Sequence, residues 1–284
     1  MIGYKIAKNS DKRVVVTLEI PSDALTNMDR SSVVVKETAK HRTNKAKVLK
    51  IEDDEGNCYP TATSFNYDKK SLDYKVSELI IEPHYNTDPE EVYAEGIHFF
   101  LNRRVAELYG LAKVENGLFE SWYDNGQKGG EVTYINGEKH GLDQSWYYDG
   151  HKYGEVTYIN GKQHGLDQTW HDNGQKKQEV TYIYGKMDGL YQNWYENGQK
   201  WWECIFVNGK KSGLCQLWDK YGDILDEFSY VDDELHGLYR RWHINGQKWE
   251  ECVYVNGEKH GLCQRWDKDG TKLRETTYMN GVRQ

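Results

Sequence analysis

Tryptophan recurs at one fixed interval over the C-terminal three-fifths of this chain, and this spacing limits the fold more than any other feature. Seven units of equal length run from Gly117 to Gln284 without an insertion. Self-similarity at a fixed period indicates a tandem array of small structural units. The periodic tryptophans are Trp122, Trp146, Trp170, Trp194, Trp218, Trp242 and Trp266.

Each unit has the pattern of one β-hairpin. In the second unit, Leu142–Tyr147 and Glu155–Ile159 are rich in aromatic and β-branched residues, Asp149-Gly150 separates them, and Asn160-Gly161 follows. These dipeptides adopt the positive φ angles of tight hairpin turns. A lone hairpin buries too little apolar surface to be stable, so we expect the hairpins to stack.

The sequence leaves the hairpin register open. Such a turn can be a two-residue type I′ turn or the end of a three-residue turn with a glycine bulge, and a one-residue change exchanges the faces. We favour the three-residue form because it lets Trp146 and Tyr158 share a face. Asp233 replaces a turn glycine and puts the turn of the fifth unit in question.

These residues resemble the MORN repeat (membrane occupation and recognition nexus), in the variant whose hairpins read W-Y-x-N-G-Q-K and Y-x-N-G-K. The resemblance covers residues 117–284. It implies a mainly β fold, a seven-hairpin ribbon of about 14 antiparallel strands, two for each hairpin. It also implies a role in binding or assembly.

Composition changes near residue 116. All ten Trp lie after this point and all four Pro lie before it. We therefore predict an N-terminal domain over 1–112, a linker over 113–116 and the array over 117–284. Because the N-terminal part has strand patterns and one amphipathic helix, we expect a small α+β domain. The predicted strands are Arg13–Ile20, Lys45–Ile51, Tyr74–Ile81 and Gly96–Phe100, and the predicted helix is Arg103–Tyr109.

The N-terminal segment also resembles an uncharacterised domain of giant-virus (marseillevirus-like) proteins. The matching phrase is G-I-H-F-F at Gly96–Phe100, followed by the helix Arg103–Tyr109, with Val14–Ile20 upstream. This resemblance implies a viral origin and implies no activity.

Charge and hydropathy exclude several classes of function. Residues 1–116 carry a net charge of −2 and the array −6, so we expect no nucleic-acid partner. No stretch approaches 18 apolar residues, and Met1–Lys8 lacks the apolar core of a signal peptide. We therefore expect a cytoplasmic protein, in host cytoplasm or virion if viral, with no transmembrane segment.

Four cysteines form two pairs with the same internal spacing, Cys204 with Cys215 and Cys252 with Cys263. One reading is a redox staple or a metal pair across neighbouring strands. The other is small buried hydrophobic residues copied by a two-unit duplication. We favour the second, because the cytosol keeps thiols reduced and buried Cys packs as an apolar residue.

The repeated polar residues argue against chemistry in the array. Equivalent positions of successive hairpins lie roughly 9.5 Å apart, whereas two imidazoles on one zinc need nitrogens within about 3.5 Å. The glutamate that recurs in every unit, from Glu131 to Glu275, is a structural ladder for the same reason. We expect no catalytic, cofactor or metal site there. The histidines at the unit ends are His140, His164, His236 and His260.

An enzyme site would therefore lie in the N-terminal domain, where no nucleophile, metal or phosphate motif occurs. His98 is better read as a core histidine than as a general base. The basic stretch between residues 36 and 50 is a solvated loop or, alternatively, a contact for phosphates of a lipid or a nucleic acid. The candidate residues for chemistry are His98, His84, His41 and Cys58, and those for phosphate are Lys45, Lys47 and Lys50.

Aromatic residues outside the periodic pattern are the better binding candidates, because the repeat does not require them. These are Trp201, Trp202 and Trp249. The final strand, predicted over 271–279, presents an edge that invites strand addition by a second copy or another partner. Its candidate residues for assembly are Lys272, Arg274, Thr276 and Tyr278.

The sequence favours a non-catalytic β-repeat scaffold that binds protein, as a structural or assembly protein of a giant virus, without small-molecule substrate or cofactor. Three alternatives stay open. They are a peripheral protein that binds phospholipid, an enzyme with its site in the N-terminal domain, and an antitoxin-like neutralising protein, a role linked to bacterial relatives of this repeat variant.

Overall fold

The structure is a computed structural model that describes residues 1–65 and 71–284. Its secondary structure is mainly β, as predicted, with one short helix in the described part of the chain. The chain forms two compact units. Residues 1–137 with 146–150 make the first unit, and residues 138–145 with 151–284 make the second.

The first unit contains a six-stranded sheet with the strand order β6-β5-β1-β2-β4-β7. A two-stranded sheet of β3 and β8 lies in the same unit and leads into α1, which Asn102 caps through its side chain. The bounds are β1 Ile2–Asn9, β2 Lys12–Glu19, β3 His41–Thr43, β4 Lys45–Glu52, β5 Thr61–Ser64, β6 Asp73–Lys75, β7 Leu79–Ile81, β8 Ile97–Phe99 and α1 Arg103–Leu108.

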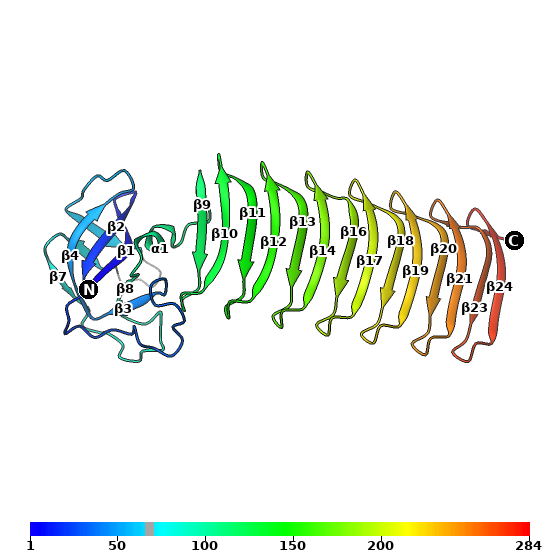
Figure 1. The fold of residues 1–284 in the computed structure, drawn as a ribbon, viewed down its shortest axis with the longest axis horizontal. Helices are drawn as coiled ribbons and strands as arrows, with labels where there is room; N and C mark the ends of the chain where they lie inside the picture. Colours follow the sequence, from blue (N-terminus) through cyan, green and yellow to red (C-terminus); the bar gives the residue numbers. More distant parts are fainter. Residues whose placement is uncertain (66–70) are drawn as a thin grey trace. The chain divides into compact units, whose positions relative to one another are not determined.

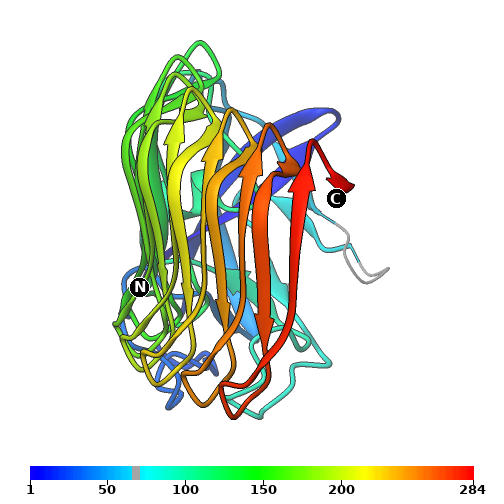
Figure 2. The ribbon, with the colours of Figure 1, turned by 90° about the vertical axis from the view of Figure 1, so that its right-hand side faces the viewer.

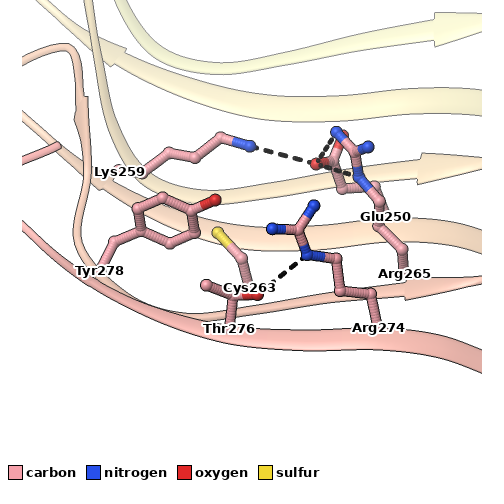
Figure 3. Close-up of a pocket in the computed structure, with 7 residues that line it drawn as sticks. All are labelled: Glu250, Lys259, Cys263, Arg265, Arg274, Thr276 and Tyr278. Carbon is pink, nitrogen blue, oxygen red and sulfur yellow. Dashed lines mark hydrogen bonds and ion pairs between the residues drawn. The ribbon is translucent and has the colours of Figure 1, made fainter. Parts of the chain in front are cut away.

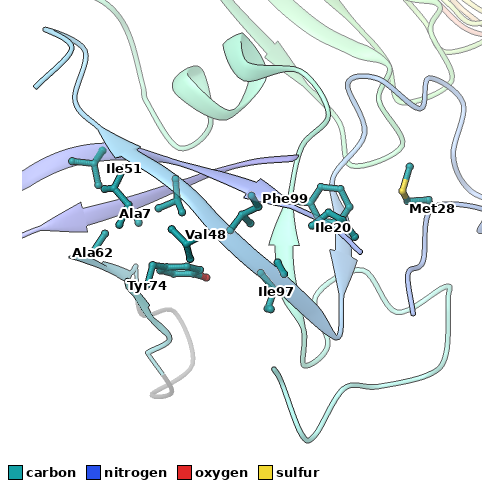
Figure 4. Packing of buried hydrophobic residues seen from close by; sticks show 13 residues of the cluster. Ala7, Ile20, Met28, Val48, Ile51, Ala62, Tyr74, Ile97 and Phe99 are labelled. Atoms are coloured by element: carbon teal, nitrogen blue, oxygen red, sulfur yellow. The ribbon is translucent and has the colours of Figure 1, made fainter. Parts of the chain in front are cut away.

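Alternation along β2 builds the core of this unit. Val14, Val16 and Leu18 point to one face and are fully buried, as side chains two residues apart do in a strand. They pack with Ile51 and Phe99 in one cluster (Figure 4). The predicted strand Tyr74–Ile81 is instead two strands, β6 and β7. Ser77 breaks it with a φ of 72° while its N–H donates to the carbonyl of Val48.

The remaining strands, β9 to β25, form a long antiparallel sheet (Figure 1). Figure 2 shows the last hairpins side by side in chain order. The sheet has 17 strands rather than about 14, because Asp188 and His260 interrupt two strands and β25 follows the last hairpin. The bounds are β9 Gly117–Trp122, β10 Lys128–Ile135, β11 Glu138–Trp146, β12 Lys152–Ile159, β13 Lys162–Trp170, β14 Lys176–Ile183, β15 Lys186–Met187, β16 Gly189–Trp194, β17 Lys200–Val207, β18 Lys210–Trp218, β19 Ile224–Val231, β20 Glu234–Trp242, β21 Lys248–Val255, β22 Glu258–Lys259, β23 Gly261–Trp266, β24 Lys272–Met279 and β25 Val282–Arg283.

Two kinds of turn alternate along the array. Asn160 and Gly161, with φ of 47° and 73°, form a two-residue turn between Ile159 and Lys162. Within the third hairpin, His171 N–H donates to the Gln175 carbonyl and Gly174 N–H donates to the His171 carbonyl. The turn inside the hairpin therefore has three residues, as we favoured.

The turn of the fifth unit is intact despite the missing glycine. Asp233 adopts a φ of 71°, and its carboxylate accepts a hydrogen bond of 2.9 Å from the backbone N–H of Lys211. Aspartate tolerates this left-handed conformation better than most residues because its short side chain bonds to nearby backbone.

The expectation that the periodic Trp and Tyr share a face is wrong. In the third hairpin Gln168 pairs with Glu179 and Trp170 pairs with Lys176, so Lys177 is an extra, bulged residue. The bulge keeps Trp170 on the face of Glu179, and Tyr182, an odd number of residues further on, lies on the opposite face. We call these the tryptophan face, with the periodic Trp, Gln and Glu, and the cysteine face, with the periodic Tyr and the paired cysteines.

The turn of the first hairpin packs against the loop that precedes β3, within the first unit. The carbonyl of Asn125 accepts hydrogen bonds from the N–H groups of Val34 and Val35, and the N–H of Lys40 donates to the carbonyl of Asp124. Asn125 is only 2% exposed, whereas the equivalent Asn173 of the third hairpin is exposed. The predicted domain boundary at 112–117 stays a prediction.

Candidate functional site

The tryptophan face is nearly the same in each repeat and satisfies its own polar groups. In the fourth hairpin, Glu203 accepts hydrogen bonds from Gln192 at 3.0 Å and from Lys200. The ammonium of Lys200 lies 5.3 Å from the ring centre of Trp218 in the next hairpin. The cation–π contact links successive hairpins, and the ion pair with Glu203 holds Lys200 in place for it, which supports a structural reading of the repeated glutamates.

The cysteine face differs from one repeat to the next. The residues at one pair of opposed positions are Ser and Gly in the first two hairpins. From the third hairpin on they change from polar to aromatic, to aliphatic and then to charged. The successive pairs are Thr169 with Gln178, Asn193 with Trp202, Leu217 with Asp226, Arg241 with Glu250, and Arg265 with Arg274.

An aromatic cluster occupies the middle of this face. Trp202 packs against Tyr191 and Phe206 with ring centres 5.0 and 6.3 Å apart. Phe206 is buried and Trp202 is half-buried. Aromatic side chains on a rigid sheet provide large contact area for a partner at low entropic cost.

Both cysteine pairs lie on this face and are joined. Cys204 opposes Cys215 directly across two neighbouring strands, with Cα atoms 4.1 Å apart, and the sulfurs are linked as a disulfide. Cys252 and Cys263 are linked in the same way. The reading of four separate reduced residues is therefore wrong, because cross-strand pairing brings each pair of thiols together. All four cysteines are buried, as expected.

The last two hairpins carry a charged cluster beside a hollow of about 50 Å³ (Figure 3). The buried carboxylate of Glu250 accepts from Arg265 at 2.9 Å and from Lys259 at 3.2 Å. Burial opposes its ionisation, but these two cations prevail and lower the pKa of Glu250. The guanidinium of Arg274 and the hydroxyl of Tyr278 point towards the same space.

The three non-periodic tryptophans take different places. Trp202 joins the aromatic cluster. Trp249 lies under Arg241, whose guanidinium carbon is 4.5 Å from its ring centre. Trp201 is 38% exposed and lies 6.4 Å from the ring of Tyr195. The structure thus brings Trp202 and Trp249 into the packing of the repeats and leaves Trp201 the most accessible.

The four residues predicted for edge assembly divide between the faces. Lys272 pairs with Glu275 on the tryptophan face at 2.6 Å, while Arg274, Thr276 and Tyr278 line the hollow on the cysteine face. Their role in assembly stays a prediction. Sequence reasoning missed Arg241, Glu250, Lys259 and Arg265. The signal for the two arginines is a charge at a position that is Thr or Asn in earlier repeats.

The candidate phosphate contacts in the first unit are largely paired. Lys45 bonds to Asp23 at 2.6 Å, and Lys50 forms an ion pair with Glu52. Lys47 is exposed on the same strand, β4. Two of the three charges are thus balanced locally, which weakens the case for a phosphate contact.

The candidates for chemistry do not form a joint site. His41 and His98 lie on the paired strands β3 and β8, but at positions that point to opposite faces. His98 is a partly buried strand residue, and burial with the nearby charges of Lys40 and Lys5 lowers its pKa to about 3. His41 is fully buried, whereas Cys58 and His84 are exposed. Over residues 1–65 and 71–284, no three His, Cys, Asp or Glu side chains are placed to hold a metal ion.

The 24-residue period, the hairpins and the two turn types describe one repeat unit. Four of the repeats match the MORN repeat variant. The matched segments are residues 115–136, 163–184, 187–208 and 235–256. Residues 1–106 match a family of unknown function (DUF5758). No curated protein matches the chain.

The predicted resemblance of the array to MORN repeats is confirmed in these segments, and the giant-virus likeness of the N-terminal part stays a prediction. Within the described residues, no helix has the length and apolar character needed to cross a membrane.

Proposed function

We propose that this MORN-repeat chain is a non-catalytic scaffold that binds a protein partner through the cysteine face of its repeats. The observation that carries the proposal is the contrast between the two faces. The tryptophan face repeats one hydrogen-bonded ladder, whereas the cysteine face changes from hairpin to hairpin over the third to the seventh. Stacking needs only the repeated contacts, so the varied face is free to encode recognition.

The chemistry of that face supports a protein partner. The aromatic cluster around Trp202 adjoins a region with arginines, and interface cores are enriched in both residue types. The hydrogen-bonded ladder of the tryptophan face and the cross-strand disulfides fix the strands. The surface is therefore preorganised, and little entropy is lost on binding.

Cross-linking with the native partner mixture tests this function. A photoreactive residue in place of Leu217, on the cysteine face, should capture partner, whereas one in place of Leu190, which lies on the tryptophan face and is 45% exposed, should capture little. Trp202→Ala should reduce capture at Leu217. Equal capture from both faces would show that the varied face does not select the partner.

A role in a giant-virus virion or viral factory stays part of the proposal, and so does a cytoplasmic location. Phospholipid binding has one feature in its favour, the arginines and lysine gathered on the last two hairpins. Liposome flotation separates the two readings. Flotation that is sensitive to salt and lost on changing Arg265 and Arg274 to Gln would favour the membrane.

A further inference from the structure

Arg265 and Arg274 face each other directly across β23 and β24 on the cysteine face. Like charges at opposed positions of an antiparallel pair repel and are destabilising. The equivalent pair in the preceding hairpin is Arg241 with Glu250, an attractive combination. A place where the sequence breaks a local rule in this way is a candidate for function.

The carboxylate nearby does not balance this pair. Glu250 accepts from Arg265 and from Lys259, so its charge is shared between two cations already. Arg274 donates through Nε to the hydroxyl of Thr276 at 3.1 Å. In the described part of the chain, no carboxylate forms an ion pair with Arg274. Three cations and one anion therefore surround the hollow.

The hollow has the size and the donors for one small anionic group. Its volume is about 50 Å³, enough to admit a carboxylate. Figure 3 shows the Arg274 guanidinium and the Tyr278 hydroxyl at its rim, beside Lys259. Arginine binds a carboxylate through two parallel hydrogen bonds, a geometry that a partner's Asp or Glu provides.

We propose that the hollow between Arg265 and Arg274 binds a carboxylate side chain from an acidic segment of the partner protein. The inference rests on the proposed function, because it names the chemistry recognised on the same face. The location favours a peptide over a lipid surface. Lys259 and Arg265 share the buried carboxylate of Glu250, so the basic spot is small, whereas anionic lipid attracts broad clusters of basic residues.

Charge on the rest of the protein makes the site selective. The whole chain carries a net charge of −8, and on the tryptophan face of the last hairpins Lys248 and Lys272 are each paired with glutamate at 2.8 and 2.6 Å. An acidic peptide is therefore repelled elsewhere and attracted here, which fixes where it binds.

Fluorescence anisotropy with labelled oligoglutamate tests the proposal on the full chain, with oligoglutamine as the neutral probe. Oligoglutamate should bind, and its affinity should fall as the salt concentration rises. Arg274→Gln should weaken binding by about tenfold, the loss of one charge-assisted hydrogen-bonded contact. Lys272→Gln is the matched control, since it removes the same charge from the same strand on the opposite face, and should leave binding within about twofold.

Stability provides a second readout. Because Arg274→Gln relieves the repulsion with Arg265, it should raise the urea midpoint while it lowers peptide affinity, and oligoglutamate should raise the midpoint of the unaltered protein only. A merely structural arginine would show a lower midpoint on substitution.

Three results would overturn the inference: no binding of oligoglutamate, equal weakening by Lys272→Gln, or Arg274-dependent binding to phosphatidylserine vesicles without binding to the peptide. If oligoglutamate fails to bind while Trp202→Ala still reduces partner capture, this inference fails and the proposed function stands.

Discussion

Gly126 is the position where a single methyl group should do the most damage, because the first hairpin turn lies directly against the loop of residues 33–39. A Cβ added there would lie 1.9 Å from the carbonyl oxygen of Val35 and 2.9 Å from the nitrogen of Ala39. Real Cβ contacts essentially never fall under 3.0 Å, and both neighbours are backbone. The loop must therefore move away from the turn.

The magnitude follows from what that movement breaks. Gly126 has a φ of 89°, so alanine costs about 1–2 kcal/mol from its left-handed conformation alone. The loop also contributes the bonds from Val34 and Val35 to Asn125, and the Thr38 hydroxyl bond of 2.6 Å to Gly126. Each is worth about 1 kcal/mol. We expect a total loss of about 4–5 kcal/mol.

Gly174 is the matched control. It occupies the same turn position in the third hairpin, with a φ of 80° and no atom within 4 Å of an added Cβ. Gly174→Ala should cost only the conformational term, about 1–2 kcal/mol. Urea unfolding measures both variants, and hydrogen exchange should show fast exchange at the Val34, Val35 and Lys40 amides in Gly126→Ala alone. Equal losses in the two variants would refute the packing of the loop on the turn.

Three further predictions concern single features of the two units. Burial lowers the pKa of Lys40 to about 8. Above this pH the unfolded lysine still binds a proton that the folded one has released. The free energy of unfolding should therefore rise by about 2 kcal/mol between pH 8 and pH 9.5. Lys40→Met should remove this rise in thermal unfolding, apart from the similar share of Lys5, whose pKa burial also lowers to about 8; an unchanged rise would contradict the assignment. Asp233→Gly should change stability by less than about 1 kcal/mol, because relief of the left-handed conformation is offset by loss of the bond from Lys211; a large loss in urea unfolding would show that the carboxylate holds the turn. Reduction of the Cys204–Cys215 disulfide, which closes a loop of 11 residues, should lower stability by about 3 kcal/mol, and a Cys204→Ala/Cys215→Ala variant should lose the corresponding part of the response to reductant.

The hairpin array was predictable because its signal is periodic. Tryptophan spacing and Asn-Gly turns report local backbone geometry, and both recur along the array. The faces were not predictable, because the bulge at Lys177 depends on how two strands pair and not on a residue type. Ser77 is a similar case, since its positive φ accompanies a bond to Val48 on another strand.

The candidate site was predictable only in part. Arg274, Thr276 and Tyr278 were singled out for their place on the last strand, and they line the hollow for a different reason, their shared face. Arg265 opposes Arg274 only in the observed register. A one-residue change in pairing would have placed another residue there, so a sequence without its register cannot show the like-charged pair.

Because one two-residue turn alternates with one three-residue turn, each repeat unit restores both the direction of the strand and the face on which each position lies. A whole unit can therefore be duplicated or deleted without exchanging the faces of any other. The two cysteine pairs, at equivalent positions two units apart, bear the mark of such a duplication. Duplication of a unit can therefore lengthen the recognition surface, and substitutions can then alter the charges of the new copy, without any change in the turns between units.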